Sequence, residues 1–190
     1  EALTLALEDH TSANMAGHAA TVEVLRQILA AMGVRCGAFA HEAKQLVEQM
    51  NHDQIDVSLV AGGTCGDDFT EYDLFDDRFF AYVSPSNSLY KKSNIQVSDI
   101  DMRELVLLSQ GNCMRDQVLE LCQSRSLYPS RYYFESGSLD TLMRMVDCTS
   151  CMTIIPEMAL EFIPLSRRNR VKSIAKGATS RRVALAVSRT

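Results

Sequence analysis

Two cysteines nine residues apart are the side chains in this sequence best suited to redox chemistry. They bound the segment Gly111-Asn112-Cys113-Met114-Arg115-Asp116-Gln117-Val118-Leu119-Glu120-Leu121-Cys122. Apolar residues recur at helical spacing in its second half, which predicts a helix from about Asp116 onward. Asn112 or its neighbour would cap that helix, so Cys113 would lie at or just before the first turn.

The start of a helix favours a thiolate, which is the form of cysteine that attacks a peroxide. Free backbone N–H groups and the helix dipole stabilise an anion there, and Arg115 adds a positive charge two residues after Cys113. Asp116 would weaken this effect if it faced the sulfur, or would hold Arg115 in place if it faced the guanidinium. The pattern therefore favours the thiolate form of Cys113.

Cys122 could react with Cys113 only if the chain between them changes shape. Nine helical residues separate two Cα atoms by roughly 13 Å along the helix axis, whereas a disulfide tolerates about 4.4–6.8 Å. A disulfide between these residues would therefore require the segment to refold, as a switch does. The spacing alone also allows two unrelated cysteines, one exposed and one buried.

The remaining candidate residues suggest weaker chemistry. Cys148 and Cys151 have a Cys-x-x-Cys spacing, but a zinc site needs four ligands and no second Cys or His pair follows at a suitable spacing. We therefore expect no metal and no cofactor, and we interpret both cysteines as buried small residues. Gly62 and Gly63 lack the order G-x-G-x-x-G and indicate no dinucleotide site.

The elements that position these residues follow the order of an α/β protein. Periodicity predicts strands at residues 3–7, 34–39, 55–60, 79–83, 105–108, 132–134, 152–155 and 183–187. It predicts helices at residues 13–32, 44–50 and 138–147 and a loop and helix around 112–124, with Gly33 as a C-cap. The acidic stretch Asp67–Asp77 leads into strand 79–83. Alternating strands and helices are typical of a parallel sheet with crossover helices, and turn-rich residues 84–88 mark a crossing between subdomains.

Composition and charge indicate a globular chain that does not itself read nucleic acid. Its 190 residues are 46% hydrophobic and 23% charged, and no apolar run approaches the ~18 residues of a membrane span. Residues 166–190 carry eight Lys or Arg and no acidic residue, which leaves 11 basic and 24 acidic groups before them, a net charge of −13. An acidic body repels nucleic acid, and the basic tail is interpreted as a solvated face. Six cysteines without an export signal predict a cytoplasmic location.

The string Gly-Asn-Cys-Met-Arg-Asp-Gln with a second cysteine nine residues after the first resembles the sensor of the OxyR group of LysR-type transcriptional regulators. That pattern is Gly-His-Cys-x-Arg-Asp-Gln followed by the second cysteine. Residues 74–77, 136–146, 152–156 and Arg181-Arg182 also resemble family segments, and the similarity is clear over about 70–187.

This resemblance implies two Rossmann-like α/β subdomains joined by two crossing strands, in the manner of type II periplasmic binding proteins. Subdomain I would be residues 1–83 plus 181–190, and subdomain II would be residues 84–180 with the redox cysteines. The family's N-terminal winged helix-turn-helix is absent from this chain.

The resemblance also implies that hydrogen peroxide oxidises Cys113, which then forms a disulfide with Cys122 and refolds the segment between them. The pocket around the peroxide would comprise Thr11, Asn112, Arg115, Asp116 and Arg182. Asn112 replaces the family's histidine, so any role that needs a titrating imidazole is lost.

The resemblance implies a homodimer or homotetramer that binds DNA through the absent N-terminal domain and that contacts RNA polymerase. Glutaredoxin or thioredoxin would be its reductant, and no membrane is implied. The implied protein is a transcription activator in the oxidative stress response and not an enzyme. Two alternatives remain: an effector domain that binds a small anionic metabolite in the inter-subdomain cleft near Ser138 and Arg182, and a peroxidase-like thiol enzyme. Thiol counting after stoichiometric peroxide separates them.

Overall fold

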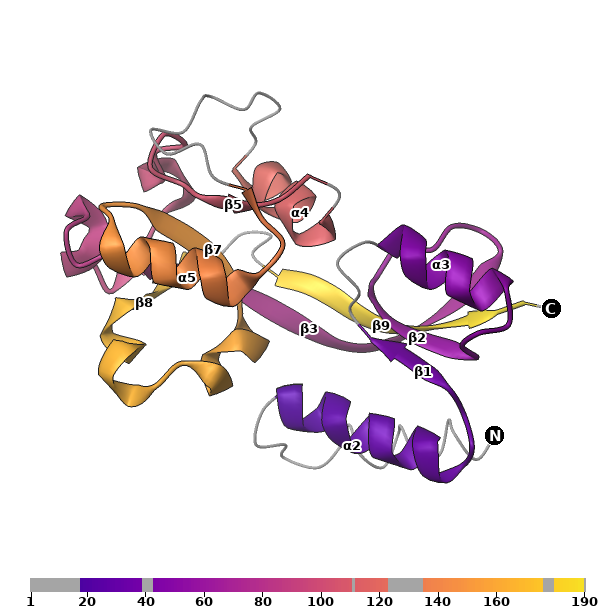
Figure 1. Ribbon diagram of the computed structural model, residues 1–190. Coiled ribbons are helices and arrows are strands. Elements are labelled where there is room, and N and C mark those ends of the chain that lie inside the picture. The colour runs from indigo at the N-terminus through magenta and orange to yellow at the C-terminus, as the bar shows by residue number, and fades with distance from the viewer. Residues whose placement is uncertain (1–17, 39–42, 111, 123–134, 176–179, 190) are drawn as a thin grey trace. The chain divides into compact units, whose positions relative to one another are not determined.

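The computed structural model describes residues 18–38, 43–110, 112–122, 135–175 and 180–189. Helices and strands alternate over this part of the chain, which confirms the predicted α/β class (Figure 1). The chain forms two compact units, and strand β3 runs from one into the other: unit 1 ends at Asp77 and resumes at Arg181, whereas unit 2 spans Arg78–Ser180. The strands predicted at residues 3–7 and 132–134 lie outside the described residues.

Unit 1 is built on a sheet with the strand order β1-β2-β9-β3. Its strands are β1 (Cys36–Ala38), β2 (Val57–Ala61), β9 (Ser180–Ser188) and the first part of β3 (Phe69–Val83). β1 and β2 are parallel, as predicted, but β9 runs antiparallel to β2. The sheet is therefore mixed rather than purely parallel.

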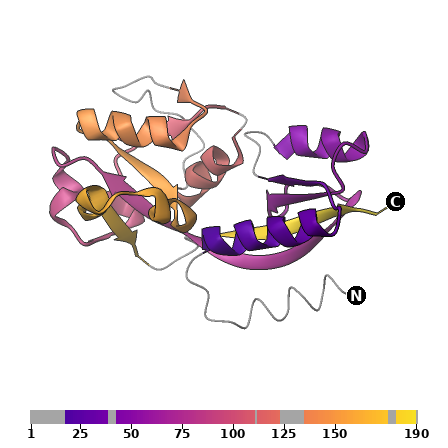
Figure 2. The same cartoon turned by 60° about the horizontal axis from the view of Figure 1, so that its bottom comes forward.

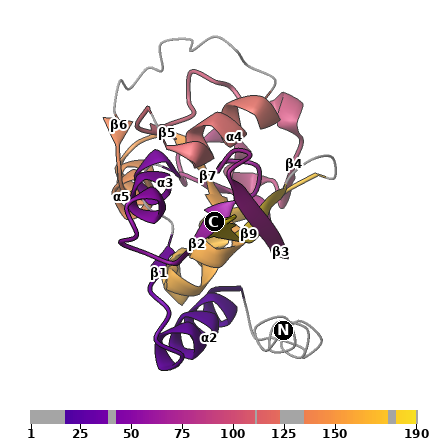
Figure 3. The same cartoon turned by 90° about the vertical axis from the view of Figure 1, so that its right-hand side faces the viewer.

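Helices cover both faces of this sheet. In the two turned views, α2 (His18–Ala31) and α3 (Ala43–Asn51) lie on opposite sides of the strands (Figures 2 and 3). All five residues of β2 are buried for that reason. Gly33 ends α2 with φ 74°, and the N–H of Val34 donates to the Leu29 carbonyl at 2.9 Å, so the predicted glycine C-cap is confirmed.

Strand β3 begins ten residues earlier than the predicted strand 79–83. The acidic stretch belongs to the strand itself: Asp73 and Asp76 are exposed, whereas Asp77 is fully buried and pairs with Arg181 at 2.9 Å. The first part of β3 lies at the edge of the unit 1 sheet, where charged side chains are common. These charges hide the apolar alternation by which the strand would have been identified.

Unit 2 places the second part of β3 between β7 and β8, with β4 beyond β8. Its strands are β4 (Asn94–Ile95), β5 (Leu107–Leu108), β6 (Glu135–Ser136), β7 (Met152–Pro156) and β8 (Val171–Ile174). The helices are α4 (Cys113–Leu121) and α5 (Leu139–Cys148), with short 3₁₀ helices η1 (Ser88–Lys91), η2 (Val97–Asp99), η3 (Glu157–Phe162) and η4 (Leu165–Arg170). α5 packs against β5, β6 and β7, and α4 packs against β5.

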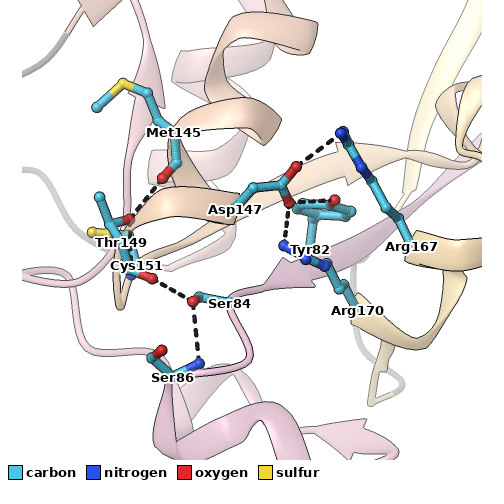
Figure 4. A network of polar contacts seen from close by, with 9 residues as sticks. All are labelled: Tyr82, Ser84, Ser86, Met145, Asp147, Thr149, Cys151, Arg167 and Arg170. Carbon is cyan, nitrogen blue, oxygen red and sulfur yellow. Dashed lines mark hydrogen bonds and ion pairs between the residues drawn. The ribbon is translucent and has the colours of Figure 1, made fainter.

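A network of charges joins β3, α5 and η4 within unit 2 (Figure 4). Asp147 accepts a hydrogen bond from the Tyr82 hydroxyl at 2.7 Å and pairs with Arg167 at 2.9 Å and with Arg170. Burial and the bond to Asp147 raise the pKa of Tyr82 to about 12. The C-terminal end of α5 is thereby fixed against the sheet.

Within the described ranges, no helix is both long and apolar enough to cross a membrane.

Candidate redox site

Helix α4 carries the two candidate redox cysteines at its two ends. Cys113 is its first residue and Cys122 is the C-cap residue that follows Leu121. The Asn112 side chain accepts a hydrogen bond from the Met114 N–H at 3.0 Å, so Asn112 is the N-cap. The helix starts three residues earlier than the predicted Asp116 because this cap satisfies a first-turn N–H.

The helix keeps the two sulfur atoms apart. All nine residues from Cys113 to Leu121 are helical, which corresponds to roughly 13 Å of rise between Cys113 and Cys122. Both thiols are free and partly buried. A direct disulfide is therefore incompatible with this conformation, as the spacing predicts.

Three side chains anchor α4 to unit 2. Met114 and Val118 are buried in its core, where each contributes roughly 1.5–3 kcal/mol. Arg115 is also buried, and its guanidinium donates to the Leu108 carbonyl on β5 at 2.7 Å. A buried cation requires such hydrogen bonds, so any movement of α4 must break this contact.

The C-terminal cysteine is held in a less reactive state than an exposed thiol. Cys122 packs with Leu121 against the core of unit 2, and its N–H donates to the Val118 carbonyl at 3.0 Å. Burial raises the pKa of the Cys122 thiol. Cys122 therefore remains protonated, and a poor nucleophile, while the end of α4 is in place.

The other predicted pocket residues lie in different surroundings. Asp116 is exposed on α4, next to the buried Arg115. Arg182 belongs to unit 1, where it pairs with Glu71 at 3.0 Å and with Asp73 at 3.2 Å. Thr11 lies outside the described residues. Asn112, Arg115 and Asp116 are neighbours of Cys113 along the start of α4, but the Arg115 guanidinium contacts Leu108 and Asp116 is exposed.

Arg182 is held closely within unit 1. A Cβ atom at Gly62 would lie 2.2 Å from the Arg182 Nε, so a side chain at position 62 would displace this guanidinium. Glu71, which pairs with Arg182, also accepts a hydrogen bond from the Gly63 N–H at 2.7 Å. Gly62 and Gly63, which follow β2, therefore contact the ion pair of Arg182 and Glu71.

Gln117 is a candidate that the sequence interpretation missed. It lies one helical turn after Cys113, so the two side chains share a face of α4. Its Oε1 atom is buried and accepts no hydrogen bond from the residues that the structure describes. An unsatisfied buried acceptor calls for a physical reason. The four-residue spacing from Cys113 was the available signal.

The structure corrects the interpretation of the second cysteine pair. Cys151 is fully buried at the start of β7, as predicted, but Cys148 is exposed at the end of α5. The Cys148 side chain is exposed because the buried side of α5 is formed by Leu142 and Val146. Among the described residues, no group of three or more His, Cys, Asp or Glu side chains could hold a metal ion.

Comparison with known proteins finds relatives that are named as transcriptional regulators or peroxide-inducible activators. The hydrogen peroxide-inducible genes activator of Haemophilus influenzae is 28% identical over 124 residues, which cover 64% of this chain and 41% of that protein. The DNA-binding transcriptional dual regulator OxyR of Escherichia coli K12 is 27% identical over 124 residues, covering 64% and 40%. This chain thus spans about two fifths of the length of these relatives, which are transcriptional regulators by name.

The solved structures agree with the sequence comparison. The OxyR structure from Porphyromonas gingivalis superposes with a TM-score of 0.69 at 25% identity, covering 78% of this chain and 67% of that one. The fold is therefore of the type II periplasmic-binding-protein kind, and the resemblance to OxyR is confirmed. A family model described as the LysR substrate binding domain matches residues 22–190. Because that match covers most of its length, the chain belongs to the LysR substrate-binding domain family.

Proposed function

We propose that this chain is the redox-sensing regulatory domain of a LysR-type transcriptional regulator that responds to hydrogen peroxide. The observation that carries the proposal is the placement of Cys113 and Cys122 at opposite ends of one short helix. The relatives named as hydrogen peroxide-inducible activators support the choice of oxidant. The chain would act as a regulator and not as an enzyme.

The proposed chemistry needs only peroxide and the two thiols. The Cys113 thiolate attacks one oxygen of hydrogen peroxide, the O–O bond breaks, and a sulfenic acid forms while hydroxide leaves and is protonated to water. The Cys122 sulfur then attacks the sulfenic sulfur, an S–S bond forms, and a second water leaves. Two thiols lose two electrons, and one peroxide becomes two waters.

Disulfide formation, the second step, would require a change in the conformation of α4. Because α4 separates the two cysteines, the disulfide can form only when α4 opens. Opening releases Cys122 from the core and breaks the contact between Arg115 and Leu108. The redox state would thereby select between two conformations, and in the full-length protein this change would alter how DNA is bound.

The residues near Cys113 have separate proposed roles in the peroxide pocket. Arg115 would fix the first turn of α4 from its buried position, and Asp116 would face solvent beside it. Gln117 would offer its unsatisfied oxygen to the O–H of peroxide or of the sulfenic acid. Thr11 and Arg182 remain proposed pocket residues from the family resemblance, and Arg182 would have to leave its carboxylate partners to take part.

The wider organisation is also proposed. Residues 1–83 plus 181–190 would form subdomain I, and residues 84–180 would form subdomain II. The domain would act as a homodimer or homotetramer in the cytoplasm, with DNA bound through an N-terminal winged helix-turn-helix and with RNA polymerase as partner. Glutaredoxin or thioredoxin would reduce the disulfide.

Disulfide mapping by mass spectrometry before and after a brief stoichiometric peroxide pulse tests the proposal. We expect two thiols to disappear and a single new crosslink to join Cys113 to Cys122, with faster hydrogen exchange across α4. Retention of all thiols, together with a rise in melting temperature on adding small organic anions, would support a metabolite-binding domain instead. Many turnovers of peroxide per protein with a reductant would support an enzyme.

A further inference from the structure

We propose that Asn112, through its cap on α4, sets how readily the pair Cys113 and Cys122 is oxidised. This inference rests on the proposed function, because it concerns the equilibrium between a dithiol with α4 intact and a disulfide with α4 open. Any contact that exists only in the intact helix favours the dithiol side of that equilibrium. The Asn112 cap is such a contact.

Asn112 has the hydrogen bonds and the backbone conformation of an N-cap residue. The Asn112 side-chain oxygen accepts from the Met114 N–H at 3.0 Å, and the Asn112 carbonyl accepts from the Arg115 N–H at 2.9 Å. The Asn112 backbone is extended, with φ −81° and ψ 121°, as an N-cap residue requires. The side-chain bond satisfies one of the first-turn N–H groups that have no partner inside the helix, and it is lost when α4 opens.

Asn112 can be changed without disturbing the core, unlike the other anchors of α4. Met114 and Val118 are buried among the apolar residues of unit 2, and Arg115 is a buried cation. Replacing any of them would perturb the whole unit as well as the helix. Asn112 is only partly buried, so its replacement acts mainly on the start of α4.

Asparagine at position 112 caps α4 better than histidine would. Asparagine is among the best N-cap residues, whereas histidine, which the OxyR sensor pattern has at this position, is not among the preferred ones. The carboxamide therefore supplies a helix cap where that pattern supplies a titratable ring. We infer that this chain holds its reduced helix more firmly than it would with histidine at 112, so that its disulfide is easier to reduce.

Redox titration of the pair in dithiothreitol buffers of fixed ratio, with thiol trapping and mass spectrometry, tests the inference. Losing an N-cap to alanine shifts a helix equilibrium about fivefold, so Asn112→Ala should favour the disulfide by about fivefold, or roughly 20 mV toward more negative potential. Asn112→Ser keeps a capping oxygen and should stay within about twofold of wild type. Asn112→His should move in the same direction as Asn112→Ala.

A purely structural role would not give this pattern. Because the cap exists only in the dithiol form, Asn112→Ala should lower resistance to urea when reduced and leave it unchanged when oxidised. Equal potentials for wild type, Asn112→Ala and Asn112→His, with the disulfide still forming, would overturn the inference and leave the proposed function standing. If Asn112→Ala failed to fold, the comparison of Asn112→His with Asn112→Ser would decide in the same way. Absence of the disulfide in wild type would instead overturn the proposed function.

Discussion

The two cysteine pairs of unit 2 differ in how the second thiol is buried, and this difference does not follow their spacing in the sequence. Cys148 and Cys151 stand three residues apart, yet one is exposed at a helix end and the other is fully buried in the sheet core. Cys113 and Cys122 stand nine residues apart, and both are partly buried at the ends of one helix. Release of a thiol from the core would require unfolding of the unit, whereas the proposed opening of one short helix would free Cys122 at lower free energy. For disulfide formation within a pair, the ease of releasing the second thiol therefore matters more than the number of residues between the two cysteines.

The strongest test of this difference is the removal of each accessible thiol. Cys113→Ser should abolish peroxide-dependent loss of thiols, because no other described cysteine combines a helix start with partial access. Cys148→Ser should still lose two thiols, as wild type does. Counting free thiols with a chromogenic disulfide reagent after a peroxide pulse measures both. Rapid thiol loss in Cys113→Ser would assign the reactive sulfur to another residue.

Removing the second thiol should stop oxidation at an intermediate. In Cys122→Ser the sulfenic acid at Cys113 has no helix-end partner, so it should persist, react with dimedone, or proceed to the sulfinic acid. Intact-mass spectrometry would detect each product. An intramolecular disulfide from Cys113 to Cys151 in this variant would show that the core thiol is released more easily than its burial indicates.

Stability should respond to the two buried partners unequally. Cys151→Ser places a hydroxyl in a fully buried site, which should lower the free energy of unfolding by about 1–3 kcal/mol. Cys122→Ser affects a partly buried helix end, so its loss should be smaller, under about 1 kcal/mol. Urea unfolding under reducing conditions, at one pH for all variants, gives the ranking. A larger loss in Cys122→Ser than in Cys151→Ser would show that Cys122 is held more firmly than Cys151.

The smallest expected effect is a dependence of stability on alkaline pH. Burial raises the pKa of Cys151 and of Cys122, so the folded state keeps protons that the unfolded chain releases above about pH 8.5. Their contribution to stability is full below that pH and declines as pH rises toward their folded-state pKa values. Replacing both by alanine should flatten the decline in urea titrations between pH 7 and 10. Cys36 and Cys65, whose pKa values are also raised by burial, would leave a residual slope.

Several local features could be predicted from the sequence because neighbours along the chain create them. The cap at Asn112, the helix that follows and the glycine end of α2 are confirmed. Each depends on hydrogen bonds between residues a few positions apart. The start of α4 was placed three residues late because apolar periodicity becomes visible only after the first turn.

Other features could not be predicted because they depend on partners far along the chain. The length of β3 is set by its place at the sheet edge in unit 1 and by its pairing with β7 and β8 in unit 2. Arg182 meets Glu71 and Asp73 more than a hundred residues away. Neither relation leaves a periodic signal, since charged side chains are favoured at an exposed edge and in ion pairs alike.

The amino-acid sequence by itself determined the α/β order, the helix between Cys113 and Cys122 and the impossibility of a disulfide across it, because helical rise and disulfide length are fixed by covalent geometry. The tertiary structure alone decided that Cys148 is exposed and that Cys122 is only partly buried at the end of α4. Burial is a property of packed neighbours, and those neighbours come from strands and helices that the local sequence does not specify.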